Sequence, residues 1–324
     1  MKKSFLGTIL IVLLLSVFTG CSAEKSQSDV LIRIGSLKGP TSIGLMKLMN
    51  DSNEGKSLGK YSFEIATTAD EILPKMISKE LDIALVPSNV ASVLYNKTKG
   101  AVKVIDINTL GVLYAVSQDE AIASINDLKG KRILVTNKGT TPDYVLQYLL
   151  NQNNISLDEV NIEYKSEAQE VAALLKEDSA SVGILPQPFA TACSISNEEL
   201  NVVLDLNKEW ETAPKNDDSM LVTGVTVVRT EFLLDNKDAV DTFLKEHEAS
   251  AKFVETNPDE TAKMVVDAKI IEKEPLAKAA IPKCNVAFIT KDEMKANLKG
   301  YLEVLFNLNP ESVGGSLPDE DFYY

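Results

Sequence analysis

Two stretches of the chain, residues 61–92 and 160–191, carry the same order of apolar and polar positions. Each begins with alternation typical of a half-buried strand, continues at helical spacing, and ends in an apolar run followed by proline. Aligned without a gap, they share five identical pairs: Glu64/Glu163, Ala69/Ala168, Glu71/Glu170, Pro87/Pro186 and Ala91/Ala190. Because self-similarity is a stronger guide than any local signal, the pattern predicts a duplicated strand–helix–strand unit.

Upstream of each copy, a further strand leads through a Lys-Gly-x-Thr sequence into a helical pattern. The first copy predicts a helix from Thr41 or Ser42, either of which can cap it, a second helix over 69–79, and strands at 31–36, 61–65, 82–86 and 102–107. The second copy predicts helices over 142–151 and 167–176 and strands at 132–136, 160–164, 181–185 and 201–204.

Long apolar runs at 110–116 and 220–229 separate the copies, and we interpret each as a strand that crosses between lobes. The prediction is an α/β protein of two lobes with a cleft between them. Residues 31–110 and 220–324 form the first lobe, and residues 111–219 form the second. Helical patterns over 238–255, from Pro258 onward and over 294–308 are placed on the first lobe.

The chain begins with basic MKK, followed by the apolar run ILIVLLLSVF and then FTGC. The apolar run is short for a membrane-spanning helix and typical of an export signal. FTGC resembles the lipobox of bacterial lipoproteins, in which the cysteine sulfur receives a lipid. We predict a signal peptide over residues 1–20, lipidation of Cys21 and a polar tether over 21–30. The alternative is an ordinary secretory peptide with a chance cysteine.

Composition narrows the choice of partners. The chain has 324 residues, 44% of them apolar, and a net charge of −14. Arginine occurs only at Arg33, Arg132 and Arg229, which argues against nucleic acid as a partner because phosphates require clustered basic groups. Besides Cys21 there are Cys193 and Cys284, which are either a disulfide between the lobes or, as we favour, two buried free thiols.

Candidate binding residues lie where the two copies match. Each Lys-Gly-x-Thr turn follows a strand and opens a helix, so it offers free N–H groups and hydroxyls to a ligand. The alternative is that these residues are ordinary helix caps. The residues after Pro87 and Pro186 also follow buried strands and reach the same edge, unless they form solvated turns. The turn candidates are Gly39, Thr41, Ser42, Gly139, Thr140 and Thr141, and those after the prolines are Ser88, Asn89 and Gln187.

Aromatic residues are weaker candidates. Trp210 forms either a wall of the cleft or part of the core, and the core role is favoured. Tyr114 is a similar case, whereas Tyr144 gains weight from its place beside the Gly139 turn. His247 is the single histidine and lies in the charged run LKEHEAS, so we predict a solvated helix face and no catalytic role. No phosphate loop, metal-ligand spacing or cofactor motif is present, so neither cofactor nor metal is predicted.

Several segments resemble one family: KGPTSIGLMKLM, ELDIALVPSNVAS, LGVLYAV, INDLKGKRILVTNKGTTPDYVL, SEAQEVAALL and LPQPFAT. Over residues 31–310 the chain resembles the substrate-binding lipoproteins of ABC importers. Within them it is similar to the nitrate/sulfonate/taurine and thiamine-precursor binding branch. The resemblance implies a two-lobed periplasmic-binding-protein-like fold of type II. It also implies ligand contacts from the turn candidates, Ser88 and Asn89, with Gln187 and Thr223 weaker.

The functional implication is a monomeric, lipid-anchored protein on the outer face of a bacterial membrane that is not an enzyme. It captures a small organic solute, sulfonate-like or vitamin-precursor-like, and delivers it to a permease that an ATPase powers. Sulfonate and nitrate binders often meet their anion with a basic residue, but only Lys38 and Lys138 flank these turns. The alternatives are an enzyme of the same fold that acts on a small aromatic acid, and a tethered solute sensor without transport.

Overall fold

The structure is a computed structural model that describes residues 30–214 and 219–324. The predicted signal peptide, Cys21 and the tether up to residue 29 lie outside the described residues. Within the described part of the chain, no helix is long and apolar enough to cross a membrane.

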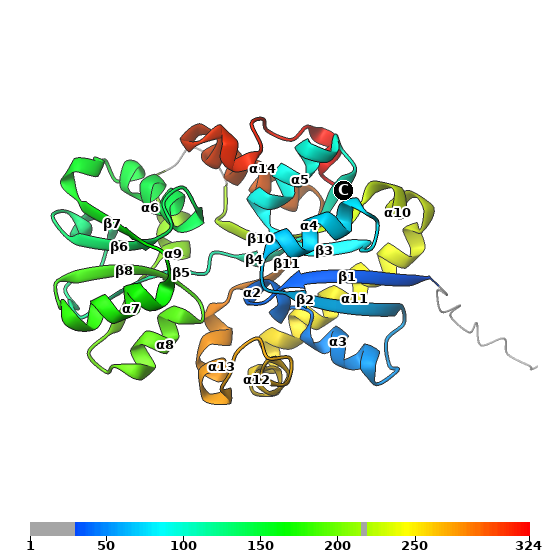
Figure 1. The fold of residues 1–324 in the computed structure, drawn as a ribbon, viewed down its shortest axis with the longest axis horizontal. Helices are drawn as coiled ribbons and strands as arrows, with labels where there is room; N and C mark the ends of the chain where they lie inside the picture. The colour runs from blue at the N-terminus through cyan, green and yellow to red at the C-terminus, as the bar shows by residue number, and fades with distance from the viewer. Residues whose placement is uncertain (1–29, 215–218) are drawn as a thin grey trace, which may run out of the picture.

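Two separate sheets form the framework (Figure 1). The first has the order β11-β4-β10-β3-β1-β2, and the second has the order β7-β6-β8-β5-β9. The strands of the first sheet are β1 (Leu31–Leu37), β2 (Lys60–Ala66), β3 (Ile83–Pro87), β4 (Val102–Leu110), β10 (Val222–Arg229) and β11 (Val286–Ile289). Those of the second are β5 (Leu113–Ser117), β6 (Arg132–Thr136), β7 (Asn161–Lys165), β8 (Ser181–Pro186) and β9 (Asn201–Asp205). We call the first sheet with its helices the first lobe, and the second sheet with its helices the second lobe.

The predicted duplication is confirmed by the pairing of the strands. β1 lies parallel to β2 and β3, and β6 lies in the same way between β7 and β8. Beyond β3 comes the antiparallel β10, and beyond β8 comes the antiparallel β5. Each of these two strands follows a crossing from the other lobe, so each sheet is completed by a strand that arrives from its neighbour.

Helices cover both faces of each sheet (Figure 1). In the first lobe, α4, α5 and α14 lie on one face and α3, α11, α12 and α13 on the other; in the second, α6 lies opposite α7 and α8. The helices are α2 (Pro40–Ile43), α3 (Met46–Asn53), α4 (Ala69–Ile77), α5 (Ser88–Thr98), α6 (Thr141–Gln152), α7 (Ala168–Glu177), α8 (Phe189–Ser196), α9 (Leu206–Thr212), α10 (Thr230–Asp235), α11 (Lys237–Thr256), α12 (Pro258–Asp267), α13 (Glu274–Ala280) and α14 (Lys291–Leu308).

Two local features differ from what the pattern alone suggested. The solvated turn that was the alternative for Ser88 and Asn89 does not form, because both begin α5 directly after β3, and apolar Leu94 and Tyr95 anchor this helix in the core. The run 110–116 is not one strand, because β4 ends at Leu110 and β5 begins at Leu113. The gap between them is where the chain leaves the first sheet.

The two crossings lie against each other at Gly111. Its N–H donates to Asn207 Oδ1 at 3.1 Å, and its carbonyl accepts from Asn285 Nδ2. A Cβ on Gly111 would lie 2.6 Å from Leu221 Cδ2, in the segment that leads back into β10. Only glycine therefore allows the outgoing and returning segments to pack so closely.

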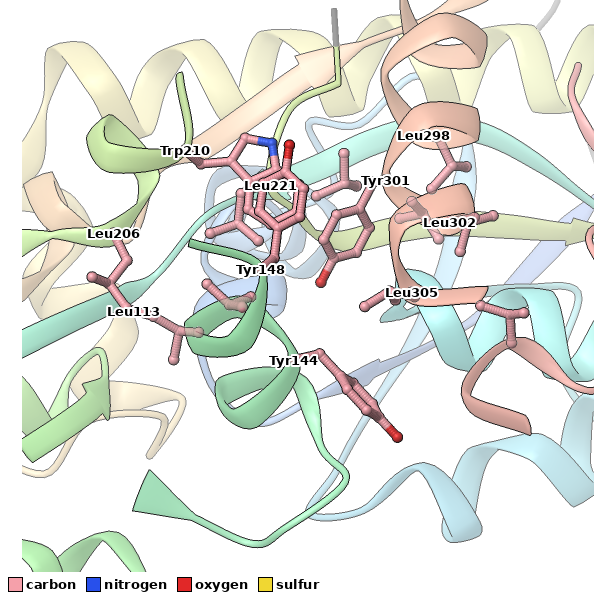
Figure 2. Close-up of a cluster of buried hydrophobic side chains, with 14 of the residues drawn as sticks. Leu113, Tyr144, Tyr148, Leu206, Trp210, Leu221, Leu298, Tyr301, Leu302 and Leu305 are labelled. Carbon is pink, nitrogen blue, oxygen red and sulfur yellow. The ribbon is translucent and has the colours of Figure 1, made fainter. Parts of the chain in front are cut away.

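An apolar cluster joins the lobes on the face that carries α14 (Figure 2). Trp210 of α9 is fully buried and stacks on Tyr148 of α6, with ring centroids 3.9 Å apart. Its ring also lies 5.5 Å from the ring of Tyr301, which belongs to α14. The favoured core role of Trp210 is confirmed, and α14, predicted on the first lobe, also contacts α6 of the second.

Asp82 ties three strands together at the opposite end of the first sheet. Its carboxylate accepts hydrogen bonds from Arg33 Nε at 2.8 Å and Arg229 Nη2 at 2.7 Å, and its side chain is fully buried. Burial alone would raise the pKa of this carboxyl, but the hydrogen bonds from Arg33 and Arg229 outweigh burial and hold that pKa below its usual value.

We predict that Trp210→Ala destabilises the protein by about 3–5 kcal/mol, because it empties the centre of the cluster that joins the lobes. Urea unfolding followed by far-UV circular dichroism measures the change. The control Ile195→Ala, at a side chain that is 56% exposed, changes the free energy of unfolding by less than about 0.5 kcal/mol. Equal effects of the two changes would contradict the described packing.

We also predict that Asp82→Asn costs about 1.5–3 kcal/mol near neutral pH, because the half-exposed Arg33 and the mostly buried Arg229 lose their charged partner. A carboxyl whose pKa is lower in the folded protein than in the unfolded chain stabilises the fold at pH values above the pKa of the unfolded chain. This contribution to stability is lost as the pH falls through the pKa of the folded protein. The difference in the free energy of unfolding between wild type and variant should therefore shrink below about pH 4. Urea unfolding across this pH range measures the difference. The control is Asp241→Asn, because Asp241 forms an exposed ion pair with Lys237. A difference in the free energy of unfolding that stays constant with pH would contradict this role of Asp82.

Candidate functional site

The candidate residues gather where strands of both sheets end. The carboxyl ends of β1 and β3 in the first lobe lead into α2 and α5, and those of β6 and β8 lead into α6 and α8. In open α/β sheets this edge is where ligands bind.

The turn after β1 packs inward. Gly39, with φ of 138°, is the cap residue of α2, so the prediction that Thr41 or Ser42 caps this helix was wrong. Both lie inside α2 and are buried, and both hydroxyls donate to the carbonyl of Leu37, at 3.2 and 2.6 Å. Ser42 Oγ also lies 2.6 Å from Ser36 Oγ.

The turn after β6 contains a buried carboxylate. Gly139, with φ of 76°, donates its N–H to Asp143 Oδ2 at 2.8 Å. Asp143 is 1% exposed, and its other oxygen accepts from Tyr164 at 2.9 Å. Burial, followed by this hydrogen bond, raises the pKa of Tyr164 to about 12. Thr140 caps α6 by position, and its hydroxyl donates back to Asn137 at 2.6 Å.

The residues after β3 and β8 are largely buried. Ser88 donates to the carbonyl of Val222 at 2.6 Å, next to the half-buried Thr223. Gln187 is 2% exposed, and its Oε1 accepts from Thr191 at 2.8 Å. Its Nε2 has no hydrogen-bond partner among the described residues. Because an unpaired buried donor is costly, this amide is the polar group of the site most in need of a partner.

A short segment after α14 links the two lobes at this edge. Asn309 Nδ2 donates to the hydroxyl of Tyr144, in the first turn of α6, at 2.8 Å. The carbonyl of Ser312 accepts from Asn89 Nδ2, in the first turn of α5, at 3.3 Å. The helix starts of the two lobes therefore meet across residues 309–312. Asn309 was not among the predicted residues, although the pair Asn309-Pro310 at the end of a helical pattern was an available signal.

The predicted solvated position of His247 was wrong. Its side chain is 0% exposed, its Nδ1 lies 3.3 Å from Asp106 Oδ2, and its ring stacks on Phe243. Asp106 Oδ1 accepts from Thr226, whose hydroxyl also accepts from Asn108 Nδ2. This buried network lies between α11 and the strands β4 and β10 of the first sheet.

Other candidates lie away from the matched turns. Tyr114 is buried, and its hydroxyl donates to the carbonyl of Lys283 at 2.8 Å. It lines a cavity of about 600 Å³ with Asp205 and Asn285. The lining of this cavity combines β9 and α9 of the second lobe with residues 282–285 of the first.

Cys193 and Cys284 are free and buried, as favoured from the sequence. Within residues 30–214 and 219–324, no group of His, Cys, Asp and Glu side chains could hold a metal ion.

Comparison with known proteins agrees with this architecture. A family model described as "ABC transporter, phosphonate, periplasmic substrate-binding protein" matches residues 56–229. A putative binding protein from Brucella abortus (strain 2308) is 24% identical over 214 residues, which cover 64% of this chain. The match spans 63% of the length of that curated relative.

Solved structures share the fold. An ABC transporter from Parabacteroides distasonis has 23% identity and a TM-score of 0.77, covering 91% of this chain and 99% of that one. The periplasmic aliphatic sulphonate binding protein SsuA from Escherichia coli has 13% identity and a TM-score of 0.69, covering 91% and 96%. The predicted periplasmic-binding-protein fold is confirmed, and at these identities the likeness concerns the fold alone.

We predict that Tyr144→Phe and Asn309→Ala each cost about 1 kcal/mol, because each removes the same hydrogen bond between the lobes. The double variant should cost less than the sum of the two, since the bond can be lost only once. Urea unfolding of all four proteins gives the coupling, with Tyr324→Phe, at an exposed tyrosine, as the control. Strictly additive losses would show that the two side chains do not interact.

Proposed function

The chain belongs to the family of phosphonate-type periplasmic substrate-binding proteins of ABC transporters, and we propose that it captures a small organic solute between its two lobes. The solute would be sulfonate-like or resemble a heteroaromatic vitamin precursor. It would contact the turns after β1 and β6 and the first residues after β3 and β8.

One observation carries this proposal: the first turns of α5 and α6, in different lobes, meet across residues 309–312. A solute at this edge would touch both lobes at once. Binding would then favour the arrangement in which the lobes are close. The size of this effect would equal the difference in the solute's binding free energy between the closed and the open arrangement. The unpaired Nε2 of Gln187 is the donor that such a solute would satisfy.

The further parts of the proposal come from the sequence. Lipid on Cys21 would hold the protein at the outer face of the bacterial membrane through a tether that ends near residue 30. The loaded monomer would then dock on a permease whose ATPase subunit powers release. A tethered sensor is the second candidate, and uptake measurements with the gene deleted distinguish the two, because only an importer component abolishes uptake of the solute.

An enzyme of the same fold is the less favoured alternative, because the family to which the chain belongs is described as substrate-binding. The imidazole of His247 is paired with Asp106 and packed against Phe243 inside the first lobe.

The first experiment is a thermal-shift screen of the chain from residue 22 onward. The panel contains alkyl phosphonates, alkyl sulfonates, taurine, nitrate, pyrimidine vitamin precursors, flavins and small aromatic acids. A compound at about a hundred times its dissociation constant adds roughly 2.7 kcal/mol of stability. Small-angle scattering should show a smaller radius of gyration with the same compound. Stabilisation without any change in dimensions would contradict capture between lobes.

We predict that Gln187→Leu weakens binding of any stabilising compound by about tenfold, because it removes a buried donor while keeping the side-chain size. Calorimetric titration measures the affinity. Gln169→Leu, at an exposed position of the second lobe, is the matched control and should bind as the wild type does. Unchanged affinity of Gln187→Leu would remove this amide from the site.

A further inference from the structure

A pocket at the far end of the first lobe takes no part in the candidate site, and we call it the end pocket. It has a volume of about 670 Å³ and is lined by the ends of α4, α5 and β10, the start of β4 and part of α10. Its floor consists of Met76, Leu94 and Val102, each at most 2% exposed. Strands β1 and β3 begin at this end and reach the candidate turns at the other, so the end pocket faces away from the solute edge (Figure 1).

Exposed apolar side chains border the end pocket. Ile77, the last residue of α4, is 58% exposed, and Leu234 of α10 is 75% exposed. Leu31, which begins β1 at the same end of the sheet, is 51% exposed. Single exposed apolar residues are ordinary, but a group of them around a pocket is typical of an interaction surface.

The second copy of the repeat differs at this position. In the ungapped alignment of residues 61–92 with 160–191, Ile77 corresponds to Lys176. Lys176 borders a pocket of about 570 Å³ between α7 and α8 in the second lobe. Both copies form the same strand–helix–strand unit, so the fold itself does not require isoleucine here. The second lobe presents a charged group to water, whereas the isoleucine of the first lobe is suited to a partner that covers it.

The polar rim of the end pocket carries a small excess of positive charge. Lys97 and Lys99 are exposed, and no ion pair to either exists in the described part of the chain. Glu231 is paired with Lys79, which leaves Asp235 as the carboxylate of the lining that has no such partner among the described residues. Lysine stems lie along apolar surface while their ammonium groups reach outward. Apolar side chains beside such lysines suit a phospholipid, which offers acyl chains beneath a layer of phosphates.

The polypeptide enters the first lobe at the same end. Val30, the first described residue, directly precedes β1. Residues 21–30 join the predicted lipid on Cys21 to this strand, and a chain of that length reaches at most about 35 Å. The membrane therefore stays within reach of the end pocket. A contact made under such a tether needs little affinity of its own, because the tether keeps the local concentration of the membrane surface high.

We propose that this end of the first lobe rests on the phospholipid surface of the membrane, with Ile77 and Leu234 among the acyl chains and Lys97 and Lys99 at the phosphates. The candidate solute edge lies at the opposite end of the same strands, so a protein in this pose holds that edge away from the lipid. The inference goes beyond solute capture and concerns a different surface, so the failure of one leaves the other standing.

The test tethers the chain from Cys21 onward to vesicles through the Cys21 sulfur. The vesicles contain phosphatidylcholine and phosphatidylglycerol in equal parts, with a trace of a lipid that carries a maleimide. Cys193 and Cys284 are buried and do not compete for it. Hydrogen–deuterium exchange compares the tethered chain with the same chain capped by a soluble maleimide. We expect slower amide exchange at the end of α4 and in α10 on the vesicle, and no change in α7.

Two outcomes would overturn the inference. One is exchange that does not slow in α4 and α10, or that slows equally in both lobes. The other is protection of α4 and α10 in the capped chain that grows with protein concentration, because a second copy of the chain would then be the partner that covers the end pocket.

A pair of double variants tests the named side chains. Ile77→Lys with Leu234→Lys should reduce the protection on the vesicle by at least about tenfold, because two apolar side chains no longer enter the lipid. Lys176 shows that the repeat accepts lysine at the position of Ile77. The control is Leu157→Lys with Ile195→Lys, at exposed apolar positions of the second lobe, and it should leave the protection unchanged. Undiminished protection in the first variant would overturn the inference, and if that variant does not fold, the wild-type comparison decides.

Discussion

The chain passes between its two sheets at adjacent points, and the outgoing segment lies against the returning one at Gly111. A side chain there would collide with Leu221 and Asn207, and both hydrogen-bonding groups of this residue are held by side chains, Asn207 and Asn285. This close passage fixes where β5 enters the second sheet and where β10 enters the first. Because each sheet needs the strand that arrives from the other, neither lobe is complete by itself.

The position of the proposed binding edge follows from that arrangement. With β5 and β10 in equivalent places, β3 and β8 become their neighbours, and the helices after these strands start beside the crossings. The cluster around Trp210 and Tyr301 holds α14 against both lobes, which delivers Asn309 to Tyr144 and Ser312 to Asn89. A scaffold joined in this way can offer a solute contacts from two lobes at once.

The sequence predicted the architecture because the repeat recurs in both lobes, and alternation, helical spacing and proline all marked the same boundaries. Prediction from the sequence failed where a local pattern favoured a structure that tertiary contacts do not allow. Ser88 and Asn89 after proline look like a turn, yet they start α5. The charged neighbours of His247 led to the prediction that it is exposed. It is buried, however, because Phe243, His247 and Val254 follow helical spacing on the buried face of α11. The direction in which hydroxyls donate, and the burial of Asp143, depend on tertiary contacts that no local pattern contains.

The most direct test of the account is the distance between the lobes in solution. Ser78 and Ser179 are exposed and follow α4 and α7, the equivalent helices of the two lobes. In the chain from residue 22 onward, which lacks Cys21, the remaining Cys193 and Cys284 are buried, so Ser78→Cys and Ser179→Cys provide a pair of sites for fluorescent labels. Single-molecule energy transfer should show one shorter distance when a stabilising solute saturates the protein. A distance that does not respond to a bound solute would contradict the claim that the solute is held between the lobes.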